Sequence, residues 1–278
     1  MGVQTLDRAV GILGCLGHSG EQGMRLVDLQ RALRLTRPTV HRILASLIEH
    51  GLVASDEGSR TYRLGWEAAV LGWSAVRGGH DLREVAQGAM NRLAEESGET
   101  AVLCACSRLD LVCIDRKSGD YPIKVFTVEI GTRRPLGIGA GSIAVLAAMS
   151  DDDALAALDA LQGRLRSYPE KLRRGIIPAM RAAREAGYAV SDGMVLPNVR
   201  GVGVAIRDPR GVAIGSMGVA SIADRASDER IGELAAMLLR EQARIERALR
   251  DKTTSRAKAT AATARRPSPA RGATVAER

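Results

Sequence analysis

Residues 24–65 read MRLVDLQRALRLTRPTVHRILASLIEHGLVASDEGSRTYRLG and predict a helix, a tight turn, a second helix and a two-stranded hairpin. The second helix is indicated by apolar residues at the i, i+3, i+4, i+7 and i+8 spacing of a helix packed on a core: Val40, Ile43, Leu44, Leu47 and Ile48. Thr36 suits the N-cap, Pro38 the first turn, and Gly51 the position after the last turn. This order of elements is typical of a winged helix-turn-helix.

The face of this second helix that lies opposite the apolar stripe is polar, and it is basic at its N-terminal end. This face and its edge carry the following residues: Arg37, Pro38, Thr39, His41 and Arg42. Residues 25–42 contain five arginines and a single acid, Asp28. Such a helix enters the major groove of DNA, so we predict a DNA-binding surface here. A small helical domain that binds protein is the alternative.

The net charge of the chain comes mainly from its C-terminal tail. Residues 252–278 hold seven Lys and Arg against one Glu, which is +6 of the formal +8. The overall charge is therefore weak support for a sequence-specific DNA reader. The tail is rich in Ala, Thr, Lys, Arg and Pro without apolar periodicity, and we expect it to be disordered. It would either add nonspecific phosphate contacts or have no role.

Membrane insertion and metal chemistry find little support in the sequence. No apolar run is long enough to span a bilayer and no signal peptide is recognisable, so we expect a cytoplasmic protein. The four cysteines lack zinc-ligand spacing, and Cys104 and Cys106 would share one face of a strand. We expect small buried thiols in place of a metal or redox site, and no cofactor.

The spacing of apolar residues in 66–80 predicts a linker helix that carries Trp66 and Trp73. This helix would either form a dimer interface or pack against its own domain. A helix over 82–97, strands at 100–106, 111–116 and 122–129, and helices near 140–149, 150–165 and 175–186 follow. Two further strands at 201–207 and 212–220 precede a last helix. The pattern predicts an α+β domain with a mainly antiparallel sheet.

The glycine-rich residues 137–142, GIGAGS, open a helix and form the best small-molecule candidate. Backbone N–H groups at a helix start favour an anion, so Gly139–Ser142 could seat a carboxylate. A nucleotide is disfavoured because no βαβ repeat frames the motif, and glycines needed only for close packing are the other alternative. Catalysis has little support, since all four histidines lie at or before residue 80 and no nucleophile-and-base pair is suggested.

Several motifs in the same order resemble the IclR family of bacterial transcriptional regulators. They include QTLDRAVGIL, LQRALRLTRPTVHRILASLIEHGLV, YRLG, LREVAQGAMNRLAEESGET, PLGIGAGSIAVLAA and GYAVSDGMVLPNVRGVGVAIRDPRG. The likeness covers residues 3–250. It implies an N-terminal winged helix-turn-helix, a linker helix used in dimerisation and a C-terminal GAF-like effector domain with a mainly antiparallel sheet. We therefore divide the chain into residues 1–65, 66–80, 81–250 and a basic tail, 251–278.

The resemblance also implies which residues contact DNA and effector. The DNA-contacting positions would be Arg37, Pro38, Thr39, His41 and Arg42, with Arg63 reaching the backbone from the wing. The effector pocket would be lined by the following residues: Ile123, Phe126, Gly139, Ala140, Gly141, Ser142, Ser191, Gly201, Gly218 and Ala220. Polar residues common in relatives are small here, at Gly137, Ser191, Gly201, Gly218 and Ala220, so we expect a wider, more apolar pocket. Arg200 and Asn198 would either pair with a carboxylate or lie at the surface.

We accordingly predict a ligand-responsive transcriptional regulator that binds a pseudo-palindromic operator as a homodimer or homotetramer. Its effector would be a carboxylic or aromatic acid larger than a two- or three-carbon keto acid. The alternatives are a small-molecule sensor acting through protein contacts and an enzyme of unknown reaction.

Overall fold

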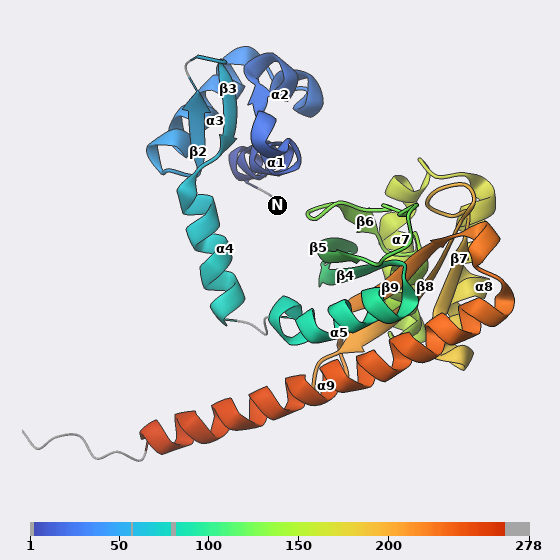
Figure 1. The fold of residues 1–278 in the computed structure, drawn as a ribbon. Helices are drawn as coiled ribbons and strands as arrows, with labels where there is room; N and C mark the ends of the chain where they lie inside the picture. Colours follow the sequence, from blue (N-terminus) through green and yellow to red (C-terminus); the bar gives the residue numbers. More distant parts are fainter. Residues whose placement is uncertain (1–2, 57, 79–81, 265–278) are drawn as a thin grey trace, which may run out of the picture.

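The computed structural model describes residues 3–56, 58–78 and 82–264, and its first part is a winged helix-turn-helix (Figure 1). Helices α1 (Gln4–His18), α2 (Leu26–Leu33) and α3 (Arg37–Glu49) pack together, and η1 (Gly20–Gln22) follows α1. The wing strands β2 (Val53–Asp56) and β3 (Thr61–Leu64) pair antiparallel, and β3 also pairs with the short β1 (Met24–Arg25). The core is built from one side of each element: Ile12, Leu16, Leu29, Val40, Ile43, Leu44, Leu47 and Val53.

Helix α1 buries only part of its apolar surface in this domain. Ile12 and Leu16 are buried, whereas Leu6 and Val10 are exposed. Helices α2 and α3 cover only one side of α1, so the apolar side chains on its other side stay outside this domain.

Helix α4 (Trp66–Gly78) leaves the wing and leads toward the second domain (Figure 1). Trp66 is 79% exposed and Trp73 58% exposed, and their ring centroids lie 6.3 Å apart. The two rings contact each other instead of packing on a domain of their own chain. The predicted boundary at 79–81 lies outside the described residues.

The second domain has three layers, with one antiparallel sheet between two groups of helices (Figure 1). The strand order is β6-β5-β4-β9-β8-β7. The strands are β4 (Thr100–Ser107), β5 (Asp110–Ser118), β6 (Arg133–Pro135), β7 (Ala189–Asp192), β8 (Val199–Arg207) and β9 (Ala213–Ile222). The predicted α+β class with a mainly antiparallel sheet is therefore confirmed.

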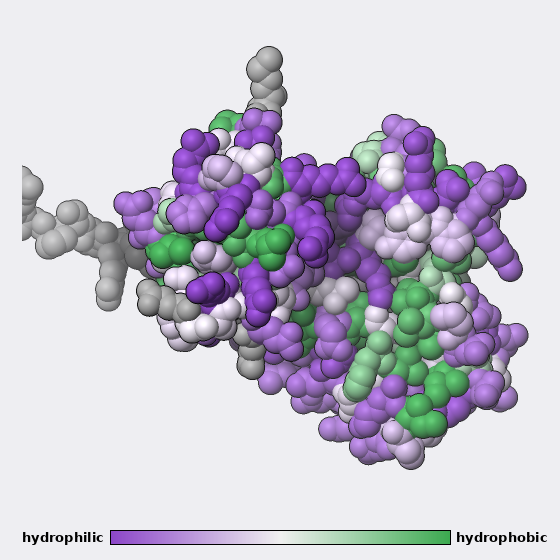
Figure 2. All heavy atoms as spheres, turned by 90° about the horizontal axis from the view of Figure 1, so that it is seen from above, coloured by the Kyte–Doolittle hydropathy of each residue, from purple (hydrophilic) through white to green (hydrophobic). Residues whose placement is uncertain are grey.

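Each face of the sheet carries its own apolar core. Helices α5 (Leu82–Ser97) and α9 (Asp228–Ala264) cover one face, packed on alternate residues of β8 such as Val202, Val204 and Ile206. Helices α6 (Ala140–Ala147), α7 (Asp151–Leu165) and α8 (Glu170–Ala186) cover the other face, where Ala205 points. Seen from above, hydrophilic side chains cover most of the molecule, and apolar atoms gather over one strip of the second domain (Figure 2).

The predicted strand at 122–129 is wrong. This segment is an irregular part of the connection between β5 and β6, although it is rich in the β-branched and aromatic residues that are typical of strands. Arginine side chains bind its carbonyl groups in place of a neighbouring strand: Arg225 to Ile123, Arg134 to Thr127 and Arg116 to Val128. The edge of β5 beside Cys113 is instead hydrogen-bonded to Gly131 and Thr132.

Two helices extend beyond their predicted bounds. Helix α8 begins at Glu170, after Pro169 at its N-cap, and contains Pro178 in its interior. Helix α9 continues to Ala264, so the expected disorder is corrected for residues 252–264. Alanine, lysine and arginine favour helix, and no proline occurs there before residue 267. The rest of the tail lies outside the described residues, and no described helix is long and apolar enough to cross a membrane.

Candidate DNA-binding surface and ligand pocket

Helix α3 presents its basic end to solvent. Arg37, Pro38, His41 and Arg42 are exposed, and Thr39 is half-buried on the same side. The opposite face is fixed in the core by Val40, Ile43, Leu44 and Leu47. Thr36 occupies the N-cap position as predicted, but its hydroxyl binds that of Thr39 at 2.9 Å in place of a backbone N–H.

The charges on this surface are free to meet an external anion. Within the described residues, Arg37 and Arg42 form no ion pair, whereas Arg31 of α2 pairs with Asp28. Arg34 closes α2 in the left-handed conformation and so forms the turn that leads to α3. An exposed, unpaired arginine pair at the start of a helix has the chemistry needed to contact bases or phosphates.

The wing is organised by Asp56. Its carboxylate accepts hydrogen bonds from Ser59 and from the backbone N–H of Gly58, at 2.9 Å for the latter, and these bonds lower the pKa of Asp56. Arg63 lies exposed on β3, opposite Ala54. Arg63 therefore lies on the second strand of the hairpin, after the turn that Asp56 stabilises.

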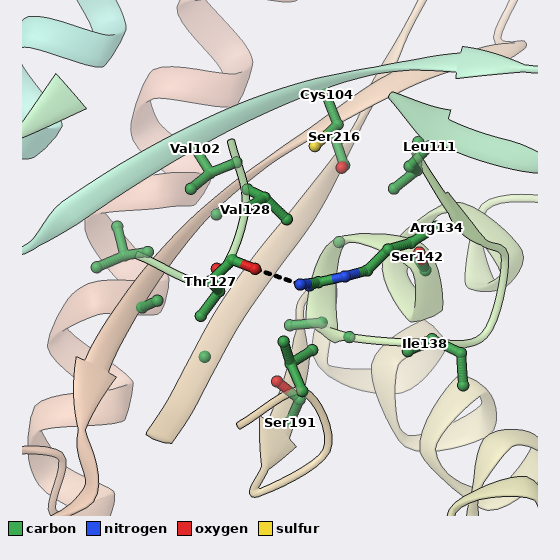
Figure 3. Close-up of a pocket in the computed structure, with 18 of the residues that line it drawn as sticks. Val102, Cys104, Leu111, Thr127, Val128, Arg134, Ile138, Ser142, Ser191 and Ser216 are labelled. Carbon is green, nitrogen blue, oxygen red and sulfur yellow. Dashed lines mark hydrogen bonds between the residues drawn. The ribbon is translucent and has the colours of Figure 1, made fainter. Parts of the chain in front are cut away.

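A pocket in the second domain lies between the sheet, the start of α6 and the segment before β6 (Figure 3). Its empty space, part of it open to solvent, is about 710 Å³. Its polar groups are hydroxyls and one guanidinium: Thr127, Thr132, Ser142, Ser191, Ser216 and Arg134.

Most of the predicted effector residues line this pocket. The ones that do are Gly139, Ala140, Gly141, Ser142, Ser191, Gly201, Gly218 and Ala220. Ile123 and Phe126 do not, because the segment expected to be a strand is irregular and leaves them 64% and 48% exposed. From the same segment, Thr127 and Val128 line the pocket instead.

The start of α6 fits tightly against β8. Gly139 has a φ of +91°, which favours glycine, and its N–H donates to the Met194 sulfur at 3.0 Å. A Cβ on Gly203 would lie 2.7 Å from the backbone nitrogen of Gly141. The glycines thus serve close packing, and one of the N–H groups expected to bind an anion already has a partner.

The expectation for Gly137 needs correction, and of the two alternatives for Arg200 and Asn198 the structure favours a place outside the pocket. A side chain at Gly137 would contact Ile176 of α8, so this glycine does not widen the pocket. Arg200 is already paired, with Asp228 at 2.8 Å and Asp192 at 3.8 Å. Asn198, in the left-handed conformation, accepts a backbone hydrogen bond from Ala223.

Cys104 lines the pocket and lies opposite Cys113 in the β4–β5 pair. The backbone groups of Cys113 bind Thr132 and Gly131, so the two cysteines form a non-hydrogen-bonded pair with close side chains. The hydrogen bond between the thiols raises the pKa of Cys104 and lowers that of Cys113, and burial raises the pKa of Cys106 to about 11. All four cysteines are free thiols.

Among the described residues that line the pocket, Arg134 is the one charged side chain, and the sequence did not single it out. It lies on β6 and reaches across the pocket, where its Nη2 donates to the backbone carbonyl of Thr127 (Figure 3). Burial lowers the pKa of its guanidinium, and no described carboxylate forms an ion pair with it. Its sequence context, Arg133-Arg134-Pro135, contains no signal that distinguishes it from the paired Arg133 beside it.

Comparison with known proteins finds the same two parts. The IclR helix-turn-helix domain matches residues 5–57, and the C-terminal domain of bacterial IclR transcriptional regulators matches residues 74–247. The HTH-type transcriptional regulator XynR of Escherichia coli is 24% identical over 89% of this chain and 97% of its own.

Solved structures show the same fold. An IclR transcriptional regulator from Alicyclobacillus acidocaldarius is similar with a TM-score of 0.73 and 20% identity, over 90% of this chain and 100% of the other. An IclR homologue from Microbacterium hydrocarbonoxydans, solved with 4-hydroxybenzoate, has a TM-score of 0.70 and 20% identity, over 89% and 99% of the two chains.

Proposed function

Because the chain belongs to the IclR family of DNA-binding transcriptional regulators, we propose that it binds a pseudo-palindromic operator and that a small organic acid changes its affinity for that operator. The observation that carries this proposal is the presence in one chain of an exposed basic helix and a formed pocket. The relatives that it matches are transcriptional regulators and not enzymes. A cytoplasmic location follows from a DNA partner.

The proposed DNA contacts are Arg37, Pro38, Thr39, His41 and Arg42 of α3, with Arg63 of the wing on the phosphate backbone. Support comes from the exposure of the basic end of α3 and the lack of an ion pair at Arg37 and Arg42 within the described residues. Two such helices would read half-sites about one helical turn apart.

We infer that α4 and α1 form the dimer contact. Trp66, Val70, Leu71 and Trp73 are exposed on α4, and Leu6 and Val10 on α1. Exposed apolar surface of this kind marks protein interfaces, and aromatic residues are enriched in them. A homodimer or homotetramer built in this way would place two α3 helices on one operator.

The effector is proposed to be an organic acid with an apolar body. The pocket combines hydroxyl groups and a guanidinium with apolar walls, and the similarly folded Microbacterium protein was solved with an aromatic acid. The effector would change operator affinity only if it binds with different affinity to the arrangement of the dimer that can bind DNA and to the arrangement that cannot.

A paired measurement tests this function. Thermal unfolding is followed with glyoxylate, pyruvate, benzoate and 4-hydroxybenzoate, and each acid that stabilises the protein is then added to an operator titration. We expect the aromatic acids to raise Tm and to change operator affinity by about 5- to 150-fold, the usual range of allosteric coupling. Stabilisation by glyoxylate or pyruvate alone would contradict the proposed effector class. Unchanged operator affinity with a bound acid would contradict ligand control.

A further inference from the structure

Arg134 carries a positive charge in the pocket wall that no described acid neutralises. The neighbouring arginines of this domain are paired: Arg225 with Glu99, Arg116 with Glu129, and Arg200 with Asp228. Burial of Arg134 lowers its pKa, and the groups that act on it electrostatically are Tyr168, Cys104 and Cys113, none of them a carboxylate. A guanidinium stays protonated in proteins, so the pocket keeps an uncompensated cation.

We propose that Arg134 binds the carboxylate of the effector and releases the carbonyl of Thr127 when it does so. This inference rests on the proposed function of the pocket as the effector site. It assigns anion recognition to a side chain of β6, in place of the backbone at the start of α6.

The available donors fit this role. One Nη2–H of Arg134 binds the Thr127 carbonyl, and the remaining donors have no acceptor among the described residues. Arg134 points into the space between Thr127 and Ser191 (Figure 3). A planar guanidinium binds a carboxylate through two parallel hydrogen bonds, which are stronger than a bond to a neutral carbonyl. In the proposed complex, the carboxylate takes the edge of the guanidinium that now binds Thr127 and so displaces the carbonyl.

The rest of the wall narrows the ligand class to monocarboxylates. Around Arg134 the lining is apolar, with Val102, Leu111, Ile138, Val195, Val199 and Val219. Among the described residues, the pocket lining contains no second cation, so a second carboxylate would be buried without a partner. Ser191, Ser142 and Ser216 offer hydroxyl partners for one neutral polar substituent.

The exchange would reach beyond the pocket through the segment that holds Thr127. Three arginines fix this segment by its carbonyls, at Ile123, Thr127 and Val128. Capture of Arg134 by the ligand removes the middle attachment and leaves the other two. Ligand-bound and ligand-free proteins would then differ in the order of residues 123–128.

Matched acids and amides test the assignment, with binding followed by Tm and by calorimetry so that no DNA is needed. The probes are benzoate, 4-hydroxybenzoate and hexanoate, each against its neutral amide, on the full chain and on the variants Arg134→Met, Arg134→Lys and Arg133→Met. Arg133 is the matched control because it lies on the same strand and pairs with Asp110 at 3.4 Å.

We expect the wild type and Arg133→Met to prefer an acid over its amide by at least about tenfold, as a charge-assisted pair implies. Arg134→Met should lose this preference while binding the amide as before, and Arg134→Lys should keep part of it. Hydrogen exchange in residues 123–128 should rise on adding the acid to wild type. An undiminished preference in Arg134→Met, or no preference in wild type, would overturn the proposal. Acid binding through Arg134 without any effect on operator affinity would instead count against the proposed regulatory function alone.

Discussion

Arg225 forms a two-point ion pair with the buried Glu99, in which its Nε and Nη2 lie 3.0 and 2.9 Å from the two carboxylate oxygens. Glu99 also accepts a hydrogen bond of 2.6 Å from Ser221, and Arg225 donates to the carbonyl of Ile123. The pair therefore joins the beginning of β4, the end of β9 and the segment that borders the pocket.

Replacing Arg225 by Met should destabilise the protein strongly. Glu99 is 3% exposed, so the substitution leaves a buried carboxylate without its cation, which costs about 3–5 kcal/mol. Urea unfolding measures the loss. The control is Arg174→Met, which removes an exposed pair with Glu170 and should change stability by less than about 1 kcal/mol. Equal effects of the two substitutions would contradict a structural role for the buried pair.

Arg37→Ala and Arg42→Ala should each weaken operator binding without lowering Tm. A lost base or phosphate contact is worth about 1–3 kcal/mol, whereas both side chains are exposed and unpaired within the described chain. Fluorescence anisotropy with labelled operator measures the affinity. Arg166→Ala removes the same charge from an exposed position in the second domain and should bind DNA like wild type. Wild-type affinity in both α3 variants would show that the recognition surface lies elsewhere.

Asp208→Asn should reduce stability at neutral pH and flatten its decline in acid. Burial alone would raise the pKa of Asp208. The carboxylate accepts hydrogen bonds from the backbone N–H groups of Val212 and Arg210, at 3.0 and 2.9 Å, and from the Arg210 side chain. These bonds outweigh the effect of burial, so the pKa of Asp208 is lowered. A carboxylate whose pKa is lower in the folded than in the unfolded protein stabilises the fold at pH values above its ordinary pKa of about 4. This contribution is lost as the pH falls through the pKa of the folded state.

Urea midpoints between pH 7 and pH 2 check this expectation. The variant should be less stable by about 1–2 kcal/mol at pH 7, and the difference should shrink below about pH 4. Asp224→Asn, at an exposed position, serves as the control. A difference that stays constant through the acid range would mean that the charge of Asp208 contributes nothing.

Gly203→Ala should disturb the pocket, whereas Gly232→Ala should be harmless. A Cβ at Gly203 would lie 2.7 and 2.9 Å from backbone atoms of Gly141 and Ala140, so β8 and the start of α6 must separate. Overpacking of this kind costs about 1–3 kcal/mol. Gly232 lies exposed in α9 with no atom within 4 Å of an added Cβ, and alanine there should stabilise by about 0.5–1 kcal/mol. Thermal unfolding ranks the two variants, and the reverse order would contradict the packing described.

The winged helix and most of the second domain could be predicted because local pattern and tertiary role agree there. Val40, Ile43, Leu44 and Leu47 are buried as their spacing predicts, whereas Ile48 at the end of the predicted stripe is 37% exposed. Gly51 follows α3 with a φ of +68°. The glycines of 139–141 and Ser142 line the pocket because a helix start packed closely on a sheet needs small residues there.

The remainder depends on contacts between residues far apart in the chain. Residues 122–129 have the β-branched and aromatic composition of a strand, yet Arg225 and Arg116 bind their carbonyls from elsewhere in the fold. Arg134 resembles any surface arginine until the sheet places it over the pocket without an acid. Whether an arginine is half-buried and lacks an acidic partner depends on the folded domain, so no local sequence pattern indicates it.

Operator reading by α3 is tested most directly by a mobility-shift titration against the DNA that flanks the gene of this protein, at two salt concentrations. Unlabelled specific fragment and scrambled fragment serve as competitors. We expect a retarded complex that the specific competitor removes and the scrambled competitor leaves in place at both salt concentrations. If scrambled DNA removes the complex equally well and complex formation falls steeply at higher salt, binding is due to nonspecific charge. That result would contradict operator recognition by α3.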